Sequence, residues 1–176
     1  YKRQVVVGGG QAGLSASYFL SKSGIEHVVF ERSQRFHSWK NDRWDSFCLV
    51  TPNWQCRLPD WPYTGHDPTG YMVKDDIVDY LEGFANSFEP PIQEGVRVTD
   101  VERCPDGKIS ITTNKSRWLA DFVILATGSY DLQVKPDFSK NLNPDIVQIS
   151  SKSYKRPSDI PCLLYTSDAA DDGLGV

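Results

Sequence analysis

The stretch VVVGGGQAG, residues 5–13, decides the fold of this 176-residue chain. A run of β-branched residues that ends in glycines is typical of a buried parallel strand. Gly8, Gly10 and Gly13 fit the pattern G-x-G-x-x-G, and the residues that follow have their apolar side chains at helical spacing. HVVFE, residues 27–31, predicts a second strand. The stretch therefore opens a β-α-β unit, whose crossover is expected to be right-handed.

The glycine pattern and the acidic residue after it predict a dinucleotide site. The first glycine permits a tight turn, the second lets backbone N–H groups approach a pyrophosphate, and the third lets helix and strand pack closely. The helix N-terminus, with Gln11 and Ala12 in its first turn, adds a partial positive charge. Glu31, with Arg32 beside it, stands where a carboxylate binds a ribose 2′-hydroxyl and would repel a 2′-phosphate. The motif disfavours NADP at this site and leaves FAD and NAD as alternatives.

The rest of the chain predicts a mixed α/β arrangement. Residues 36–71 are rich in aromatic residues and prolines, which makes long regular elements unexpected. KDDIVDYLEGFANSF predicts an amphipathic helix that Asp75 caps. VRVTDVERC, KISITTN and SRWLADF predict a three-stranded antiparallel meander with a turn at PDG, and FVILATG predicts one more buried strand.

These segments resemble the two-dinucleotide-fold flavoproteins, and within them the flavin-containing and Baeyer–Villiger-like monooxygenases. The aromatic segment after Glu31, the meander and LATGSYD at residues 125–131 favour FAD over NAD. The match at LATGSYD and beyond it rests on Ala126, Thr127, Gly128, Tyr130 and Pro136. The resemblance implies an α/β, Rossmann-like FAD-binding domain with a parallel sheet and an antiparallel β-meander.

The resemblance also implies roles for residues and cofactors. Trp39 would lie near the flavin, the backbone of Val98 would meet the adenine, and Thr127 and Gly128 would border FAD. In the family NADPH reduces FAD, and a flavin hydroperoxide then transfers one oxygen atom to a small-molecule substrate. Because the cofactor carries this chemistry, we assign no catalytic residue.

Two observations keep other flavin reactions open. Such monooxygenases carry F-x-G-x-x-x-H after ATG, whereas this chain has PDIVQISSKSY at residues 144–154, with Ser150 at the histidine position. A flavin disulfide reductase is the rival enzyme, but it requires a redox CxxC, which the four cysteines do not form.

We expect residues 1–161 to form an incomplete FAD-binding domain, and the NADPH-binding domain with its own G-x-G-x-x-G to be missing. Residues 162–176 match nothing in the family, and residues 162–172 resemble a translated sequencing adapter. We therefore expect a non-native or disordered tail. A flavin-binding fragment without turnover is the alternative function.

The composition of the chain limits the classes of partner, metal and cellular location that we expect. The net charge of −4 gives no reason to expect nucleic acid or an anionic membrane. No apolar run approaches the ~20 residues that span a bilayer. The three histidines share no metal-ligand spacing, so no metal is expected. Cysteines without a disulfide pattern favour a reducing, cytoplasmic location.

Overall fold

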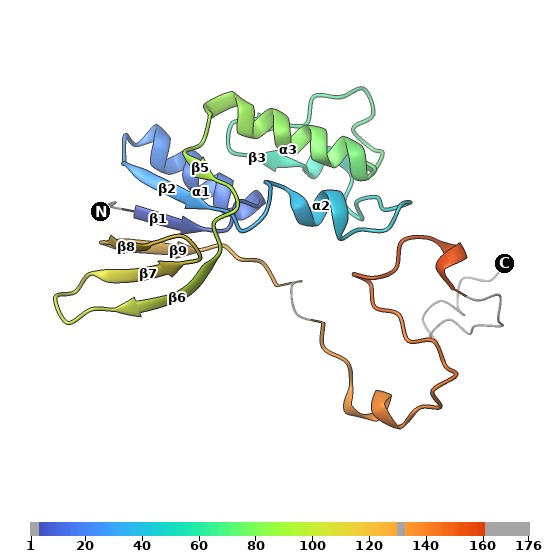
Figure 1. Ribbon diagram of the computed structural model, residues 1–176. Coiled ribbons are helices and arrows are strands. Elements are labelled where there is room, and N and C mark those ends of the chain that lie inside the picture. Colours follow the sequence, from blue (N-terminus) through green and yellow to red (C-terminus); the bar gives the residue numbers. More distant parts are fainter. Residues whose placement is uncertain (1–3, 130–132, 161–176) are drawn as a thin grey trace.

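A four-stranded parallel sheet forms the centre of the fold in the computed structural model, which describes residues 4–129 and 133–160 (Figure 1). The order is β5-β2-β1-β9. The strands are β1 (Gln4–Val7), β2 (His27–Phe30), β5 (Ile92–Gln93) and β9 (Phe122–Leu125). Because all four strands run in the same direction, their carboxyl ends meet at one edge of the sheet, where ligands of such folds bind.

Two helices cover one face of this sheet (Figure 1). Helix α1 (Gln11–Lys22) joins β1 to β2, and α3 (Lys74–Phe88) packs beside it. The predicted amphipathic pattern of α3 is confirmed, because its buried residues share one face: Ile77, Leu81, Phe84 and Ala85. They form one core cluster with Leu14 of α1 and with side chains of the aromatic segment.

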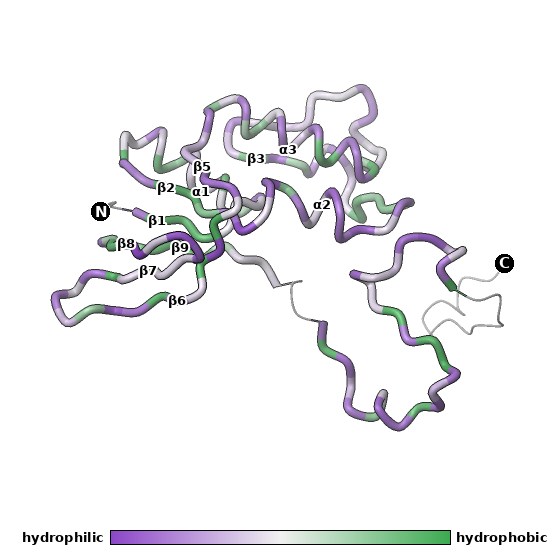
Figure 2. The backbone as a smooth tube through the Cα atoms, viewed as in Figure 1, coloured by the Kyte–Doolittle hydropathy of each residue, from purple (hydrophilic) through white to green (hydrophobic). Residues whose placement is uncertain are grey.

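The meander covers the other face of the sheet. It consists of β6 (Val98–Arg103), β7 (Ile109–Thr113) and β8 (Arg117–Ala120), paired antiparallel in the order β6-β7-β8 as predicted. Trp118 of β8 packs its ring 5.1 Å from that of Phe30, centroid to centroid. Figure 2 shows the hydrophobic residues concentrated in the central strands between these layers.

The aromatic segment holds only short elements, as expected. These are α2 (His37–Asn41), a 3₁₀ turn (Asn53–Gln55) and the paired strands β3 (Arg57–Leu58) and β4 (Trp61–Pro62). The buried Asn53 braces the segment: its side-chain oxygen accepts from the Met72 N–H at 2.7 Å, and its amide donates to the carbonyl of Asp67 at 2.9 Å.

Residues 133–160 form an extended arm that returns to the body near α2 (Figure 1). The arm has two 3₁₀ turns, Asp137–Asn141 and Pro157–Asp159. The N–H of Asp45 donates to the Lys155 carbonyl at 2.8 Å, and the Lys155 ammonium donates to the Arg43 carbonyl at 3.2 Å. Among the helices that the structure describes, none has the length and apolar character to cross a membrane.

Two expectations are wrong. Asp75 does not cap α3: the cap position is Val73 without a side-chain bond, and Asp75 lies inside the first turn, where its charge suits the helix dipole. Strand β9 is not buried, because Phe122 is 64% and Leu125 67% exposed. It pairs with β1 on one side, and within the described residues no strand pairs with its other side. Tyr130 and residues 162–176 lie outside the described residues.

Candidate cofactor-binding site

The glycine-rich turn joins β1 to α1 at the carboxyl edge of the sheet. Gly8 has a φ of 110°, and its N–H donates to the Phe30 carbonyl of β2 at 2.8 Å. A Cβ on Gly8 would lie 2.3 Å from the carbonyl oxygen of Ala126, and one on Gly13 would lie 1.8 Å from the carbonyl oxygen of Gly8. Gly8 therefore requires glycine because of its positive φ. Both Gly8 and Gly13 also require it because neighbouring backbone atoms leave no room for a Cβ.

Gly10 differs from these two glycines, because a Cβ there would meet no atom within 4 Å. It is the N-cap of α1 and offers no side-chain bond to the helix, and the first turn contains no acidic residue. Gln11 and Ala12 in that turn are exposed. An uncapped helix N-terminus beside open space suits an anionic group such as a phosphate.

The ATG segment lies against this turn. The Ala126 N–H donates to the Val7 carbonyl at 2.8 Å, which extends the pairing of β9 with β1. Thr127 and Gly128 follow at the surface, and Gly128 has a φ of 74°. The sheet thus brings Thr127 and Gly128 to the edge that carries the glycine turn, although more than a hundred residues separate the two segments.

Glu31 is held next to the turn by two backbone donors. Its Oε2 accepts from the Gly9 N–H at 2.8 Å and its Oε1 from the Ser33 N–H at 2.9 Å. Arg32 beside it is half-buried. The sequence analysis did not predict that Gly9 and Ser33 hold the Glu31 carboxylate. The additional glycine within GGG is the sequence feature that could have pointed to Gly9.

Trp39 and Val98 come from two other parts of the fold. Trp39, on α2, is half-buried against Phe47, and the Arg43 guanidinium lies 4.9 Å from its ring centroid. Val98 opens β6, where it pairs with Thr113 and packs on the core between sheet and meander. Their contacts with a cofactor stay predictions.

A hollow of about 500 Å³ adjoins the turn at Ile92 of β5. Its other lining residues are polar: Gln34, Arg35, Lys40, Glu82 and Glu94. Arg35 and Lys40 both contact the carboxylate of Glu82, at 2.9 and 2.8 Å. Because most of its lining is polar or charged, the hollow differs from the largely apolar pockets that are typical of small-molecule sites.

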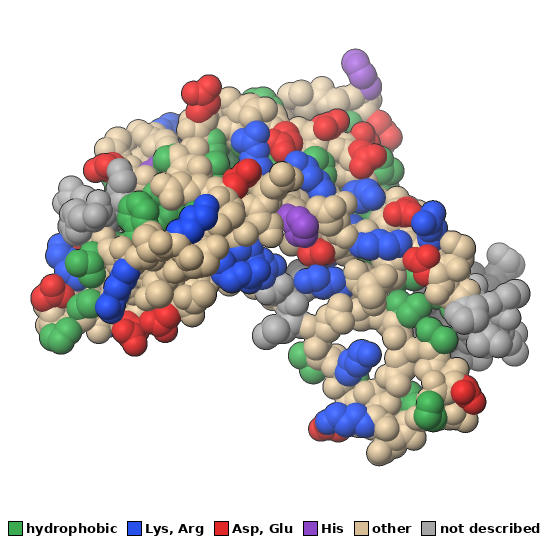
Figure 3. All heavy atoms as spheres, in the orientation of Figure 1, with side chains coloured by type: hydrophobic (Ala, Val, Ile, Leu, Met, Phe, Trp, Pro, Cys, Tyr) green, Lys and Arg blue, Asp and Glu red, His purple; other side chains and the backbone are tan. Residues whose placement is uncertain are grey.

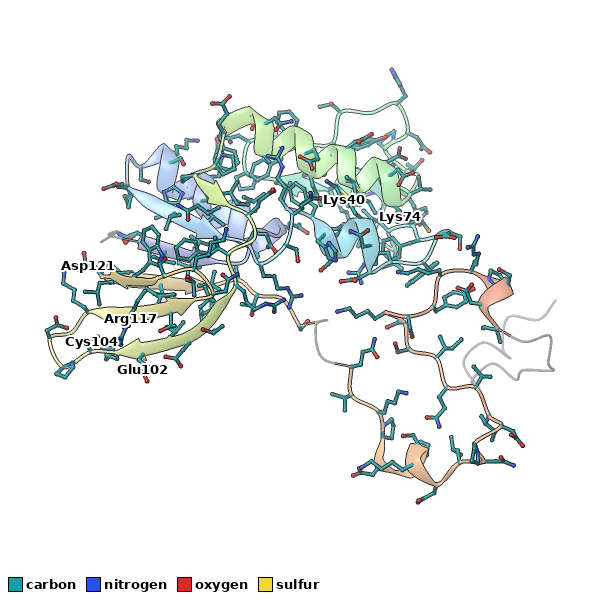
Figure 4. All side chains as sticks on the ribbon, in the orientation of Figure 1. Lys40, Lys74, Glu102, Cys104, Arg117 and Asp121 are labelled. Atoms are coloured by element: carbon teal, nitrogen blue, oxygen red, sulfur yellow. The ribbon has the colours of Figure 1, made fainter. Side chains whose placement is uncertain are left out.

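Charged side chains away from the turn form pairs on several elements (Figure 4). Arg117 lies 3.9 Å from Glu102 on the meander, and Lys74 of α3 lies 4.0 Å from Asp45. Figure 3 shows basic and acidic side chains interspersed over the visible face. In residues 4–129 and 133–160, no group of His, Cys, Asp and Glu side chains is suited to hold a metal ion.

Comparison with known proteins agrees with this architecture. Residues 5–160 match the family described as pyridine nucleotide-disulphide oxidoreductase. An uncharacterized CzcO-like oxidoreductase of Geobacillus kaustophilus is 35% identical over 157 residues, which cover 89% of this chain and 44% of that protein. The indole-3-pyruvate monooxygenase YUCCA6 of Arabidopsis thaliana is 33% identical over 76% of this chain and 33% of its own length.

Among solved structures, a flavin-containing monooxygenase from Stenotrophomonas maltophilia is 30% identical with a TM-score of 0.69, covering 77% of this chain and 41% of its own. The chain thus spans less than half the length of each of these relatives. The match over residues 5–160, on a fold with the glycine turn at its carboxyl edge, shows that the chain belongs to the pyridine nucleotide-disulphide oxidoreductase family.

Proposed function

We propose that this chain is the FAD-binding part of an NADPH-dependent flavoprotein oxidoreductase of the monooxygenase type. The observation that carries the proposal is the open space at Gly10, bordered by an uncapped helix N-terminus and adjacent to Glu31 and the ATG segment. The 30% identity to a flavin-containing monooxygenase and 33% identity to an indole-3-pyruvate monooxygenase support it.

The hydrogen-bonding groups and charges of the described residues suit FAD. The N–H groups of Gln11, Ala12 and Gly13 would bind the pyrophosphate, and Glu31 would accept from the ribose hydroxyls. The backbone of Val98 would bind the adenine. Arg32, Trp39, Thr127 and Gly128 would border the rest of the cofactor, which supplies hydride acceptance and oxygen activation when bound.

The domain boundary and the oxygen transfer are part of the same proposal. Residues 1–161 would be the FAD-binding domain, and NADPH and most of the small-molecule substrate would bind to a second domain of a longer protein. The match covers only 44% of the CzcO-like protein and 33% of YUCCA6, so each relative has length enough for a second domain, which supports this division. Against a disulfide reductase, Cys48, Cys56 and Cys104 are free cysteines with no CxxC spacing.

A visible spectrum of the purified chain tests the cofactor. We expect yellow protein, or FAD uptake in a fluorescence titration, with at least about tenfold weaker binding of FAD in Gly10→Ala. The control is Gly107→Ala in the meander turn, where a φ of 84° makes alanine strained but which lies away from the glycine turn, so this variant should bind FAD like the wild type. Colourless protein that binds NAD and not FAD would contradict the proposal.

NADPH oxidation tests the division into domains. The FAD-loaded chain alone should oxidise NADPH no faster than free FAD does, because the proposal places the NADPH site in a separate domain. Oxidation that is faster and saturates with NADPH would show that residues 1–161 also hold that site.

A further inference from the structure

Gly9 lies between the first two glycines of the motif and has no role in the G-x-G-x-x-G pattern. A Cβ built on it would lie 2.7 Å from Cδ1 of Ile92 and 2.9 Å from Cβ of Glu31. It would also lie 3.2 Å from Oε2 of Glu31. Separations under 3 Å are closer than carbon atoms pack in proteins, so any side chain at this position displaces Ile92 or Glu31.

The N–H of Gly9 is one of two donors that fix the Glu31 carboxylate. It donates to Oε2 at 2.8 Å, and the N–H of Ser33 donates to Oε1 at 2.9 Å. With one donor on each oxygen, the orientation of the carboxylate plane is fixed. An ionised carboxylate has about four acceptor sites, so each oxygen keeps a lone pair for a ligand hydroxyl.

The backbone of Glu31 is fixed as well. Its N–H donates to the Gln93 carbonyl at 3.0 Å, and its carbonyl accepts from the Val96 N–H at 2.8 Å. Because the backbone is anchored to β5 and the residues after it, the side-chain torsions are the remaining freedom of Glu31. The two N–H donors remove that freedom before a ligand arrives, which lowers the entropic cost of binding.

We propose that Gly9 is a positioning residue that holds Glu31 for the 2′-hydroxyl of an adenosine ribose and thereby makes the site selective for that hydroxyl. The inference rests on the proposed function, because it concerns the ADP half of the same cofactor. It assigns selectivity to a residue without a side chain: the absent Cβ makes room for Glu31, and the N–H orients it.

Isothermal titration of the chain with ADP and with 2′-deoxy-ADP tests the inference. A hydrogen bond to a charged group corresponds to about tenfold in affinity, so the wild type should bind 2′-deoxy-ADP about tenfold more weakly than ADP. In Gly9→Ala this ratio should fall to about one, because Glu31 is displaced. Gly10→Ala is the control: it weakens both nucleotides through the pyrophosphate and keeps the ratio.

A second variant separates positioning from folding. Ile92→Val removes Cδ1, the atom closest to the added Cβ, and leaves the contact with Glu31 in place. Gly9→Ala combined with Ile92→Val therefore keeps only the contacts with Glu31, and its ratio should still be about tenfold lower than that of Ile92→Val alone. Circular dichroism confirms the fold of each variant.

The outcomes separate this inference from the proposed function. If Gly9→Ala or the double variant binds both nucleotides more weakly at the wild-type ratio, Gly9 is only structural and the inference is overturned. If the wild type binds ADP and 2′-deoxy-ADP equally well, the inference fails while the cofactor assignment stands. If the wild type binds neither ADP nor FAD, both are overturned.

Discussion

At the scale of single residues, the three motif glycines are required for different reasons. Gly13 excludes a side chain because the backbone of Gly8 occupies its place, whereas Gly10 faces open space. Substitution at Gly13 should therefore lower the stability of the fold, whereas substitution at Gly10 should weaken the binding of a ligand in the open space. The motif assigns the second glycine to the approach of a pyrophosphate and the third to close packing, and the open space at Gly10 and the close contact at Gly13 agree with this division.

Alanine at these two positions should separate stability from binding. Gly13→Ala should lower the free energy of unfolding by about 3 kcal/mol or more, because backbone atoms cannot yield as a flexible side chain does. Gly10→Ala should lower it by less than about 1 kcal/mol, since alanine is only a poorer N-cap than glycine. Urea denaturation followed by circular dichroism measures both, and equal losses would contradict this assignment.

Tyr80 of α3 is a second residue whose role the structure reveals. Its hydroxyl donates to the Trp61 carbonyl at 2.5 Å and accepts from the Leu58 N–H at 3.1 Å, and burial raises its pKa. Leu58 and Trp61 also pair with each other in the β3–β4 ladder, so Tyr80→Phe removes additional hydrogen bonds to these backbone groups and should cost about 0.5–1.5 kcal/mol. Tyr71→Phe at an exposed tyrosine is the control, and chemical denaturation of both variants checks the difference.

At the scale of elements, polar contacts attach the β3–β4 turn to helix α1. Asp60, with a φ of 52°, accepts from the Lys22 ammonium and from the Tyr18 hydroxyl, both at 2.6 Å. These hydrogen bonds, Lys22 first, hold the pKa of Asp60 below its ordinary 3.8. The link therefore joins two elements that are far apart in the sequence and is sensitive to acid.

The stability supplied by Asp60 should disappear in acid. A carboxyl group with a lowered pKa in the folded state stabilises the protein above its ordinary value, and this contribution is lost as the pH falls through the folded-state pKa. Asp60→Asn keeps a residue that tolerates the left-handed backbone and removes the charge. The Tm difference between wild type and variant should be larger at about pH 7 than at about pH 2.5. A Tm difference that does not change with pH would mean that the charge of Asp60 does not contribute to stability.

At the scale of the whole molecule, the parallel sheet presents an apolar edge. Phe122, Ile124 and Leu125 of β9 are 64%, 36% and 67% exposed, although parallel strands are ordinarily covered on both faces. The register places Val123 beside Val5, in the core that the meander covers. Phe122 and Ile124 lie on the face of β9 opposite to Val123, and this face is largely open, in accord with a proposed further domain. Leu125 lies on the same face as Val123 and is exposed at the carboxyl end of the strand.

Lysine substitutions on the two faces of β9 should differ in their effect on the free energy of unfolding. Phe122→Lys should change the free energy of unfolding by less than about 0.5 kcal/mol and reduce the fluorescence of a bound apolar dye, because it removes exposed apolar surface. Val123→Lys is the matched control and should cost about 2 kcal/mol or more, since it places a charge in the core. Denaturation and dye titration of both variants measure these effects.

Local pattern was sufficient for the longer elements, whereas the two-residue strand β5 was not predicted. The β-branched run with its glycines, the i, i+4, i+7 spacing of Ile77, Leu81 and Phe84, and the PDG turn each predicted the observed structure, because each depends on neighbours in sequence. The cap at Asp75 was wrong because Val73, with an extended backbone, takes the N-cap position, so the helix begins two residues earlier than a cap at Asp75 would allow.

By itself, then, the sequence determined the β-α-β unit and the meander, since hydrophobic period and glycine placement act over a few residues, and its resemblance to known flavoproteins indicated the family. Only the tertiary structure decided that Gly9 and Ser33 hold Glu31, that Gly10 alone among the motif glycines faces open space, and that β9 is an edge strand. These features depend on atoms from distant segments that meet at the carboxyl edge of the sheet, and no local pattern encodes such distances.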